Sequence, residues 1–196
     1  ASSCVMFIKF ISLADKNFTI KNPIHMKKSI LTITVFVFTL ISSLEITAQD
    51  FKKLDKSPMD MAAFPSSYKI SDKVVKVIYS RPQLKGRDLV KLAPPKKVWR
   101  TGANEAAEIT FYKDVVFGGE EVKAGAYSLF TIPSSDGDWT VIINRAKNVW
   151  GSYYYNEDQD VVRVSGKVSK SEKTIEAFSM MFDKNMTLKM GWGNTV

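Results

Sequence analysis

The sequence predicts an all-β fold, an antiparallel β-sandwich of the jelly-roll or Ig-like kind, with a flattened β-barrel as the alternative. Three observations support this prediction. Roughly eight or nine short runs rich in β-branched and aromatic residues follow one another after residue 71. Turn signals such as Gly118-Gly119 and Asp136-Gly137 separate them. No amphipathic pattern long enough for a three-turn helix is visible.

Each expected strand is a short run of alternating or β-branched residues between two turn signals. Pro82 and Pro133 end two of the runs, because proline cannot donate a hydrogen bond to a β-ladder. The stretch 83–100 has no clean period and contains Pro94-Pro95, so we interpret it as a long structured loop without a helix. We expect strands at 73–80, 108–112, 114–117, 120–122, 126–132, 139–144, 160–168, 174–182 and 186–192.

The last of these strands has the clearest alternation. Apolar and polar residues follow each other with a period of two, which is the side-chain period of a β-strand. The alternation places four apolar side chains on one face of the strand, those of Met186, Leu188, Met190 and Trp192.

A secretory signal peptide is predicted at 26–48. Met26-Lys27-Lys28 is basic, residues 29–44 carry no charge, and Ala48 is a small residue at the expected cleavage position. The uncharged run is shorter than the roughly 20 apolar residues of a membrane span. We therefore expect a protein exported to the periplasm or the exterior, and not membrane-spanning once cleaved. The alternative is a chain held in the membrane by an uncleaved signal helix.

The remaining boundaries follow from this position of the signal. We interpret 1–25 as an unstructured upstream extension of the reading frame, with a genuine N-terminal tail as the alternative. The segment 49–70 contains Pro58 and Pro65 and is expected to lead into a β-sandwich domain at 71–196. Because the chain stops soon after Trp192, we expect that domain to lack its final strand.

Composition after Gln49 excludes several kinds of chemistry. The only cysteine, Cys4, and the only histidine, His25, both precede that residue. Without them there are no disulfides, no zinc sites of the usual types, no Ser-His-Asp triad and no thiol nucleophile. We therefore predict no metal, no cofactor and no catalytic residue, and we lean towards a protein that is not an enzyme.

The charge pattern is moderate. Of 28 basic and 20 acidic side chains in the whole chain, five and two precede Gln49, which leaves 23 and 18 and a net charge of +5. These charges are interspersed, whereas a nucleic-acid-binding surface needs a basic stripe or patch. Nucleic acid is therefore not expected as a partner.

A stretch rich in arginine, between two expected strands, is the first candidate binding site. Loops on a rigid β scaffold are where binding residues tend to lie. Guanidinium groups grip carboxylates, phosphates or sugar hydroxyls, and an amide and a carboxylate can orient the ligand. The alternative is that the arginines pair with acids and fasten the loop, with the tryptophan in the core. The candidates are Arg81, Lys85, Arg87, Trp99, Arg100, Asn104 and Glu105.

An aromatic run at 148–155 is the second candidate, with Trp150 and Tyr153 as its site residues. Aromatic rings among small polar residues suit sugar stacking or an aromatic-lined cleft. The alternative is that the rings cap the core at a sheet edge.

Several segments resemble the bacterial family called domain of unknown function 2911. They are 79–82, 85–87, 98–106 with the sequence VWRTGANEA, 124–133, and Trp150-Gly151. The resemblance covers nearly all of the chain after Gln49 and implies a secreted protein of gram-negative bacteria. It implies no established activity, cofactor or catalytic residue. One departure is Ala93-Pro94-Pro95, where the resemblance leads us to expect a glycine-bearing turn.

Two main functions follow as hypotheses. The first is a non-enzymatic binding or envelope-associated module that uses the arginine-rich loop to hold a small molecule, a glycan or an envelope protein. The alternative is a carboxylate-dependent hydrolase acting on a carbohydrate-like substrate. Its possible acids are scattered and no spacing singles out a pair; they are Glu105, Glu108, Glu157, Asp158 and Asp160.

Overall fold

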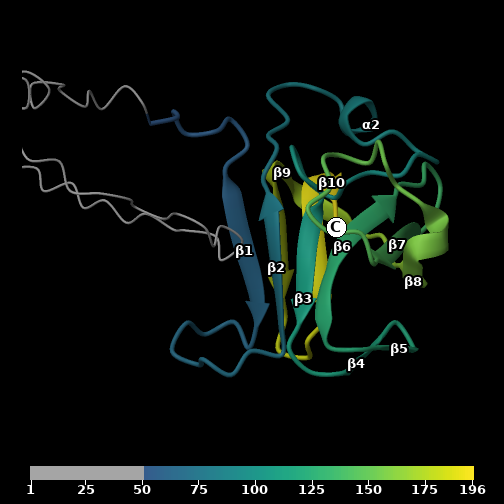
Figure 1. Cartoon of the computed structure of the whole chain (residues 1–196). Coiled ribbons are helices and arrows are strands. Elements are labelled where there is room, and N and C mark those ends of the chain that lie inside the picture. The colour runs from purple at the N-terminus through teal and green to yellow at the C-terminus, as the bar shows by residue number, and fades with distance from the viewer. Residues whose placement is uncertain (1–50) are drawn as a thin grey trace, which may run out of the picture. The chain divides into compact units, whose positions relative to one another are not determined.

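The computed structural model describes residues 51–196, so the predicted upstream extension (1–25) and signal peptide (26–48) lie outside the described residues. Within that range the chain forms ten strands and hardly any helix, which confirms the predicted all-β class (Figure 1). In this described part, no helix has the length and apolar character that crossing a bilayer requires.

A six-stranded antiparallel sheet forms the larger layer. Its strand order follows the chain, and β1 does not pair with β8, so the sheet is an open meander and not a closed barrel. The sheet therefore lacks the Greek-key order of jelly-roll and Ig folds. In spatial order it contains β1 (Met59–Phe64), β2 (Val75–Ser80), β3 (Ala107–Phe111), β6 (Gly125–Ile132), β7 (Trp139–Asn144) and β8 (Asp160–Gly166).

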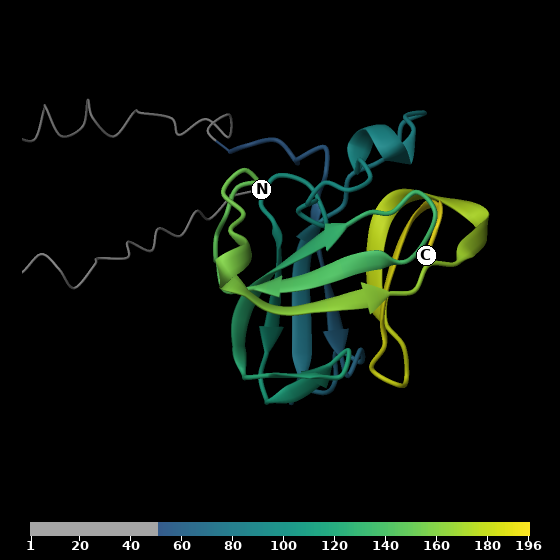
Figure 2. The same ribbon diagram turned by 90° about the vertical axis from the view of Figure 1, so that its right-hand side faces the viewer.

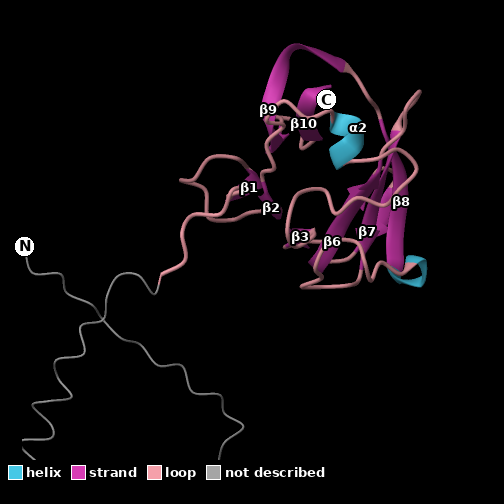
Figure 3. Cartoon of the chain, turned by 90° about the horizontal axis from the view of Figure 1, so that it is seen from above, coloured by secondary structure: helices cyan, strands magenta, loops and turns pink. Residues whose placement is uncertain are grey.

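A long hairpin forms the second layer of the sandwich. It consists of β9 (Lys170–Phe182) and β10 (Leu188–Thr195), paired antiparallel with irregular register near Gly191 and Gly193. β9 contacts β1, and it also bonds to the chain after β2 through the bridge between Gln83 and Ala177. Figure 2 shows the hairpin in yellow beside the larger sheet, and Figure 3 shows it across from β7 and β8.

Alternation explains how the strands build the core between these layers. In β2 the side chains of Val75, Val77 and Tyr79 are buried, whereas Lys76 and Ile78 are more exposed. Burying one face of each strand supplies the main driving force of folding. The core contains residues from both layers, including Phe178 and Trp192 of the hairpin.

Two expected loops contain more structure than predicted. The lead-in 49–70 includes β1, which is an edge strand of the large sheet. The stretch 83–100, expected to have no helix, contains one helical turn, α2 (Leu89–Leu92). This turn ends at Ala93, before the two prolines, so the prolines limit the helix without preventing it.

The expected turn after β4 (Val115–Phe117) is present. Gly118 and Gly119 both have positive φ angles, 61° and 98°, and they lead into β5 (Glu120–Val122). Glycine has no Cβ and adopts such angles without steric cost, which favours this dipeptide at a tight hairpin.

Candidate functional site

Arg81 is committed to holding the two layers together. Its Nε donates to the carbonyl of Phe178 at 3.0 Å, and its Nη2 donates to Ser179 Oγ at 2.7 Å. Its Nη1 forms an ion pair with Asp60 at 3.1 Å. The guanidinium thus links the end of β2 to β1 and β9. Arg81 therefore fits the alternative interpretation, in which the arginines pair with acids and fasten the loop.

Lys85 and Arg87 belong to the turn after β2. Arg87 donates from Nε to the carbonyl of Leu84 at 2.9 Å and from Nη2 to that of Gln83 at 2.6 Å, so it closes its own turn. Lys85 is exposed, and its backbone N–H donates to the side chain of Glu176 at 2.7 Å. Arg87 thus uses its guanidinium within the turn, and neither residue shares a hydrogen-bonding partner with Arg100.

Trp99 lies in the core. It is 6% exposed and stacks on Trp192 with 5.4 Å between ring centroids. Its backbone exchanges hydrogen bonds with Thr131 of β6, at 2.7 and 3.0 Å. Its ring is therefore placed among core residues and not on an open binding surface.

Arg100 differs from the other two arginines. Its Nε is buried without a hydrogen-bond acceptor, and it forms no ion pair with any described residue. Within residues 51–196 Arg100 makes a single hydrogen bond, in which its backbone carbonyl accepts from the Ala107 N–H at 3.0 Å. Its guanidinium is therefore not spent on fastening the loop.

The loops 98–106 and 148–155 are bound to each other by their backbones. The N–H of Ala106 donates to the carbonyl of Val149 at 3.0 Å, and the N–H of Gly151 donates to that of Asn104 at 3.0 Å. A β-bridge pairs Glu105 with Trp150, so their side chains emerge on the same side. The structure thereby brings together five predicted residues, Arg100, Asn104, Glu105, Trp150 and Tyr153.

Gly151 is the point where the arginine and an aromatic ring meet. Its φ angle is 65°, and a Cβ at this position would lie 2.8 Å from Tyr153 Cε2 and 3.6 Å from Arg100 Nη1. A larger residue would therefore clash with the tyrosine ring as well as strain the backbone. Tyr153 and the guanidinium of Arg100 both lie against this glycine.

Polar groups and rings remain available on this part of the surface. Trp150, Tyr153 and Tyr154 are 57%, 76% and 81% exposed. Tyr154 was not among the predicted site residues, although it lies in the same aromatic run. Among the described residues, the side chains of Asn104 and Glu105 make no hydrogen bond. We name this set the arginine–aromatic face, and it comprises Arg100, Asn104, Glu105, Trp150, Tyr153 and Tyr154.

Tyr155 anchors the aromatic run to the sheet. Its hydroxyl donates to Asp160 Oδ2 at 2.6 Å and accepts from Arg163 Nη2 at 3.1 Å. Its ring packs edge-on against Phe130, with 5.2 Å between centroids. Burial, and then the hydrogen bond to Asp160, raises the pKa of Tyr155 to about 12. The three tyrosines of the run therefore divide into two exposed rings and one anchor.

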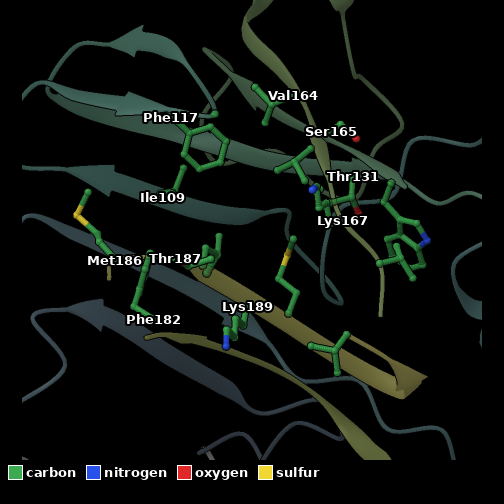
Figure 4. A pocket seen from close by; sticks show the side chains of 18 of the residues that line it. Ile109, Phe117, Thr131, Val164, Ser165, Lys167, Phe182, Met186, Thr187 and Lys189 are labelled. Atoms are coloured by element: carbon green, nitrogen blue, oxygen red, sulfur yellow. The ribbon is translucent and has the colours of Figure 1, made fainter. Parts of the chain in front are cut away.

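A cavity of about 560 Å³ lies between the larger sheet and the β9–β10 hairpin. Figure 4 shows Ile109, Phe117 and Val164 on one side of it and Phe182 and Met186 on the other. The four side chains predicted on one face of the last strand all line it, those of Met186, Leu188, Met190 and Trp192. The alternation in the sequence indicated which side chains share this wall of the cavity. It did not indicate that the opposite wall, on the larger sheet, lies far enough away to leave a space.

The two cavities described within residues 51–196 do not bring carboxylates together. Neither this cavity nor a second one between β1 and β9 includes an aspartate or glutamate in its lining. No group of three metal-ligating side chains is found between residues 51 and 196. The hydrolase hypothesis therefore gains no specific observation in its favour.

Comparison with known proteins gives one match. The family model described as "Protein of unknown function (DUF2911)" matches residues 57–196. No curated protein and no solved structure matches the chain. The matched range contains every strand and both loops of the arginine–aromatic face. The chain belongs to the DUF2911 family.

Proposed function

We propose that the domain is a binding module that holds an acidic glycan at the arginine–aromatic face. Exposed aromatic rings offer flat apolar surfaces for the C–H faces of sugars. A guanidinium pairs with a carboxylate through two parallel hydrogen bonds, which gives both strength and orientation. The amide of Asn104 and the carboxylate of Glu105 supply donors and acceptors for sugar hydroxyls.

The observation that carries this proposal is the state of Arg100. Arg81 and Arg87 spend their guanidinium groups on protein acceptors, whereas Arg100 has no acceptor among the described residues. Its Nη1 lies near Gly151 and therefore beside Tyr153. A carboxylate bound there would add charge-assisted hydrogen bonds without breaking an existing ion pair.

A matched pair of oligosaccharides tests the proposal. The full chain is titrated with tetragalacturonate and with neutral galactotetraose, and binding is measured by calorimetry. We expect tetragalacturonate to bind at least about tenfold more tightly, because only it offers carboxylates to Arg100. Arg100→Ala should abolish this difference. Trp150→Ala should weaken both ligands, by on the order of fivefold for a lost stacking contact.

Two control variants make the test specific. Arg87→Ala removes an arginine of the same loop region that closes its own turn, and Tyr68→Ala removes an exposed ring that is not part of the face. Both should bind like the unmodified chain. Equal binding of the two ligands, or unchanged binding after Arg100→Ala, would refute the proposal.

We also propose that the domain acts outside the cytoplasm, in the periplasm or beyond it. The support is the sequence pattern at 26–48, with its basic start, uncharged run and Ala48. Expression in a gram-negative host, followed by fractionation and N-terminal sequencing, tests this. We expect a product that starts at Gln49 in the periplasm, whereas an intact N-terminus in the cytoplasm would contradict it.

A further inference from the structure

The inter-sheet cavity is open to solvent along part of its lining, where Val116 and Lys167 are exposed. Protein interiors are close-packed, with few voids larger than a water molecule. The cavity of about 560 Å³ lies in the range of small-molecule sites, roughly 300 to 1,000 Å³. Its walls are the core faces of the two layers, with Ile109 and Phe117 opposite Phe182 and Met186 (Figure 4).

Apolar side chains dominate the interior of the cavity. Met186 and Met190 are unbranched and flexible, so they can adapt to an apolar ligand of variable shape. Trp99, Trp139 and Trp192 also contribute to the wall. The interior therefore suits a hydrocarbon chain better than a sugar or a nucleotide.

The charged side chains that line the cavity are all basic. Lys167 and Lys189 are exposed residues of the lining, which is drawn wholly from described residues and contains no aspartate or glutamate. Lys189 pairs with Asp183 at 3.6 Å, whereas Lys167 forms no ion pair with a described residue. The hydroxyls of Ser165 and Ser169, which also line the cavity, already donate within the protein, to Asp138 Oδ2 and to the carbonyl of Val196, each at 3.2 Å. An anionic head group with an apolar tail complements this lining.

We propose that the cavity between the β9–β10 hairpin and the larger sheet binds a free fatty acid, with its acyl chain between the layers and its carboxylate at Lys167. This site is separate from the arginine–aromatic face, and the proposal does not depend on that face. Burial of the hydrocarbon chain provides most of the affinity. The lysine selects for the acid.

The four tryptophans of the chain allow a direct test. Trp99, Trp139 and Trp192 line the cavity, whereas Trp150 does not. In the full chain with Trp150→Phe, the remaining fluorescence therefore reports on the cavity walls. Addition of 9,10-dibromostearic acid should quench it, with saturation at one equivalent and reversal by unlabelled dodecanoate. Quenching no stronger than that of free N-acetyltryptophanamide would overturn the proposal.

Varying the chain length and the head group of the ligand makes the test more specific. Across octanoate, decanoate and dodecanoate, Kd should fall by about fourfold per added methylene until the cavity is full. Lys167→Gln should weaken dodecanoate by up to about fivefold, as for an exposed ion pair, and leave dodecanol unchanged. The neighbouring Lys170→Gln serves as the control and should change neither, because Lys170 is exposed and is not part of the lining.

A cavity-filling variant adds an independent test. Val164→Phe places a larger side chain on the β8 wall and should weaken dodecanoate at least tenfold, whereas Ile78→Phe, on an exposed face of β2, should not. If Val164→Phe does not fold, the quenching assay and the Lys167→Gln variant still test the proposal. Binding of lysophosphatidylglycerol without dodecanoate, or a stable dimer that excludes the probe, would overturn it.

Discussion

Arg81 and Arg100 lie at opposite ends of the same stretch of chain and have opposite roles. Arg81 makes three side-chain contacts, to Asp60, Phe178 and Ser179, and these join three strands. Arg100 has no acceptor among the described residues and lies beside a loop with exposed aromatic rings. Their neighbours in sequence do not reveal this difference, since a turn residue follows each of them, Pro82 after Arg81 and Gly102 after Arg100.

The satisfaction of its hydrogen-bond donors distinguishes a structural arginine from one available to a ligand. A guanidinium with every donor satisfied by protein has little to offer a ligand, because binding would first break those hydrogen bonds. A guanidinium without acceptors gains from a ligand at no such cost. Substitutions of Arg81, Arg100, Tyr155 and Lys96, in order of decreasing effect, test this distinction.

Removal of Arg81 should have the largest effect on stability. Arg81→Ala loses an ion pair and two hydrogen bonds and leaves the carbonyl of Phe178 with one donor fewer. The expected loss of unfolding free energy is about 2 kcal/mol. Urea denaturation measures it. If Arg81→Ala leaves stability unchanged and weakens glycan binding instead, the two arginines have been assigned the wrong way round.

Removal of Arg100 should change binding and leave stability almost unchanged. Arg100→Ala breaks no hydrogen bond or ion pair with a described residue, so its unfolding free energy should stay within about 0.5 kcal/mol of the parent. The affinity for tetragalacturonate should fall by about tenfold. Denaturation and calorimetry on the same preparation separate the two effects. A large loss of stability would mean that Arg100 is structural, like Arg81.

Tyr155 tests whether the aromatic run needs its anchor. Its pKa rises from 10 to about 12 in the folded state, so folding favours the protonated hydroxyl. This contribution to stability is complete below pH 10 and is lost as the pH rises from 10 towards 12. Tyr155→Phe should cost about 1 kcal/mol at pH 7.

The same variant should also remove the part of the alkaline loss of stability that Tyr155 causes. Thermal unfolding of parent and variant at several pH values between 8 and 12 measures this. Tyr153→Phe is the control, because that hydroxyl makes no hydrogen bond with the described residues. If Tyr155→Phe and the parent lose stability equally at alkaline pH, the anchor role is refuted.

Replacement of Lys96 should have the smallest effect. Lys96 lies just before the loop 98–106 and does not belong to the arginine–aromatic face. It has a φ angle of 61°, which is strained for a residue with a side chain. It directly follows the Ala93-Pro94-Pro95 segment, where the family resemblance led us to expect a glycine-bearing turn. Lys96→Gly should raise the unfolding free energy by about 0.5 to 1 kcal/mol, because relief of the backbone strain exceeds the entropic cost of glycine, and should leave glycan binding unchanged. A stabilised variant with altered binding would show that the strain is coupled to the face.

Much of the fold could be predicted because strands carry local signals. The alternation at 186–192 and the glycine pair after β4 depend only on neighbouring residues. The glycine pair forms the expected turn, and the expected strand is present but runs from Leu188 to Thr195, so Met186 lies before it. The edge strand β1 was not predicted, because an edge strand beside prolines lacks a clear period. The single turn α2 was also missed, because one helical turn is too short for a periodic pattern.

The sequence offered the arginine-rich stretch and the aromatic run as two separate candidates. The structure brings Arg100, Asn104 and Glu105 of the first together with Trp150 of the second, because a β-bridge joins these two distant loops. Arg81, Lys85, Arg87 and Trp99 belong to other contacts. Their partners could not be identified beforehand; Phe178, for example, lies 97 residues from Arg81.

By itself, the sequence determined the all-β class, most strand positions, the family and the absence of histidine and cysteine after Gln49. These properties depend on composition and on patterns between near neighbours. The lack of an acceptor for Arg100 among the described residues and the cavity between the two layers are visible only in the folded molecule. Both depend on contacts between distant segments, and the satisfaction of a donor or the filling of a core is settled only when those segments meet.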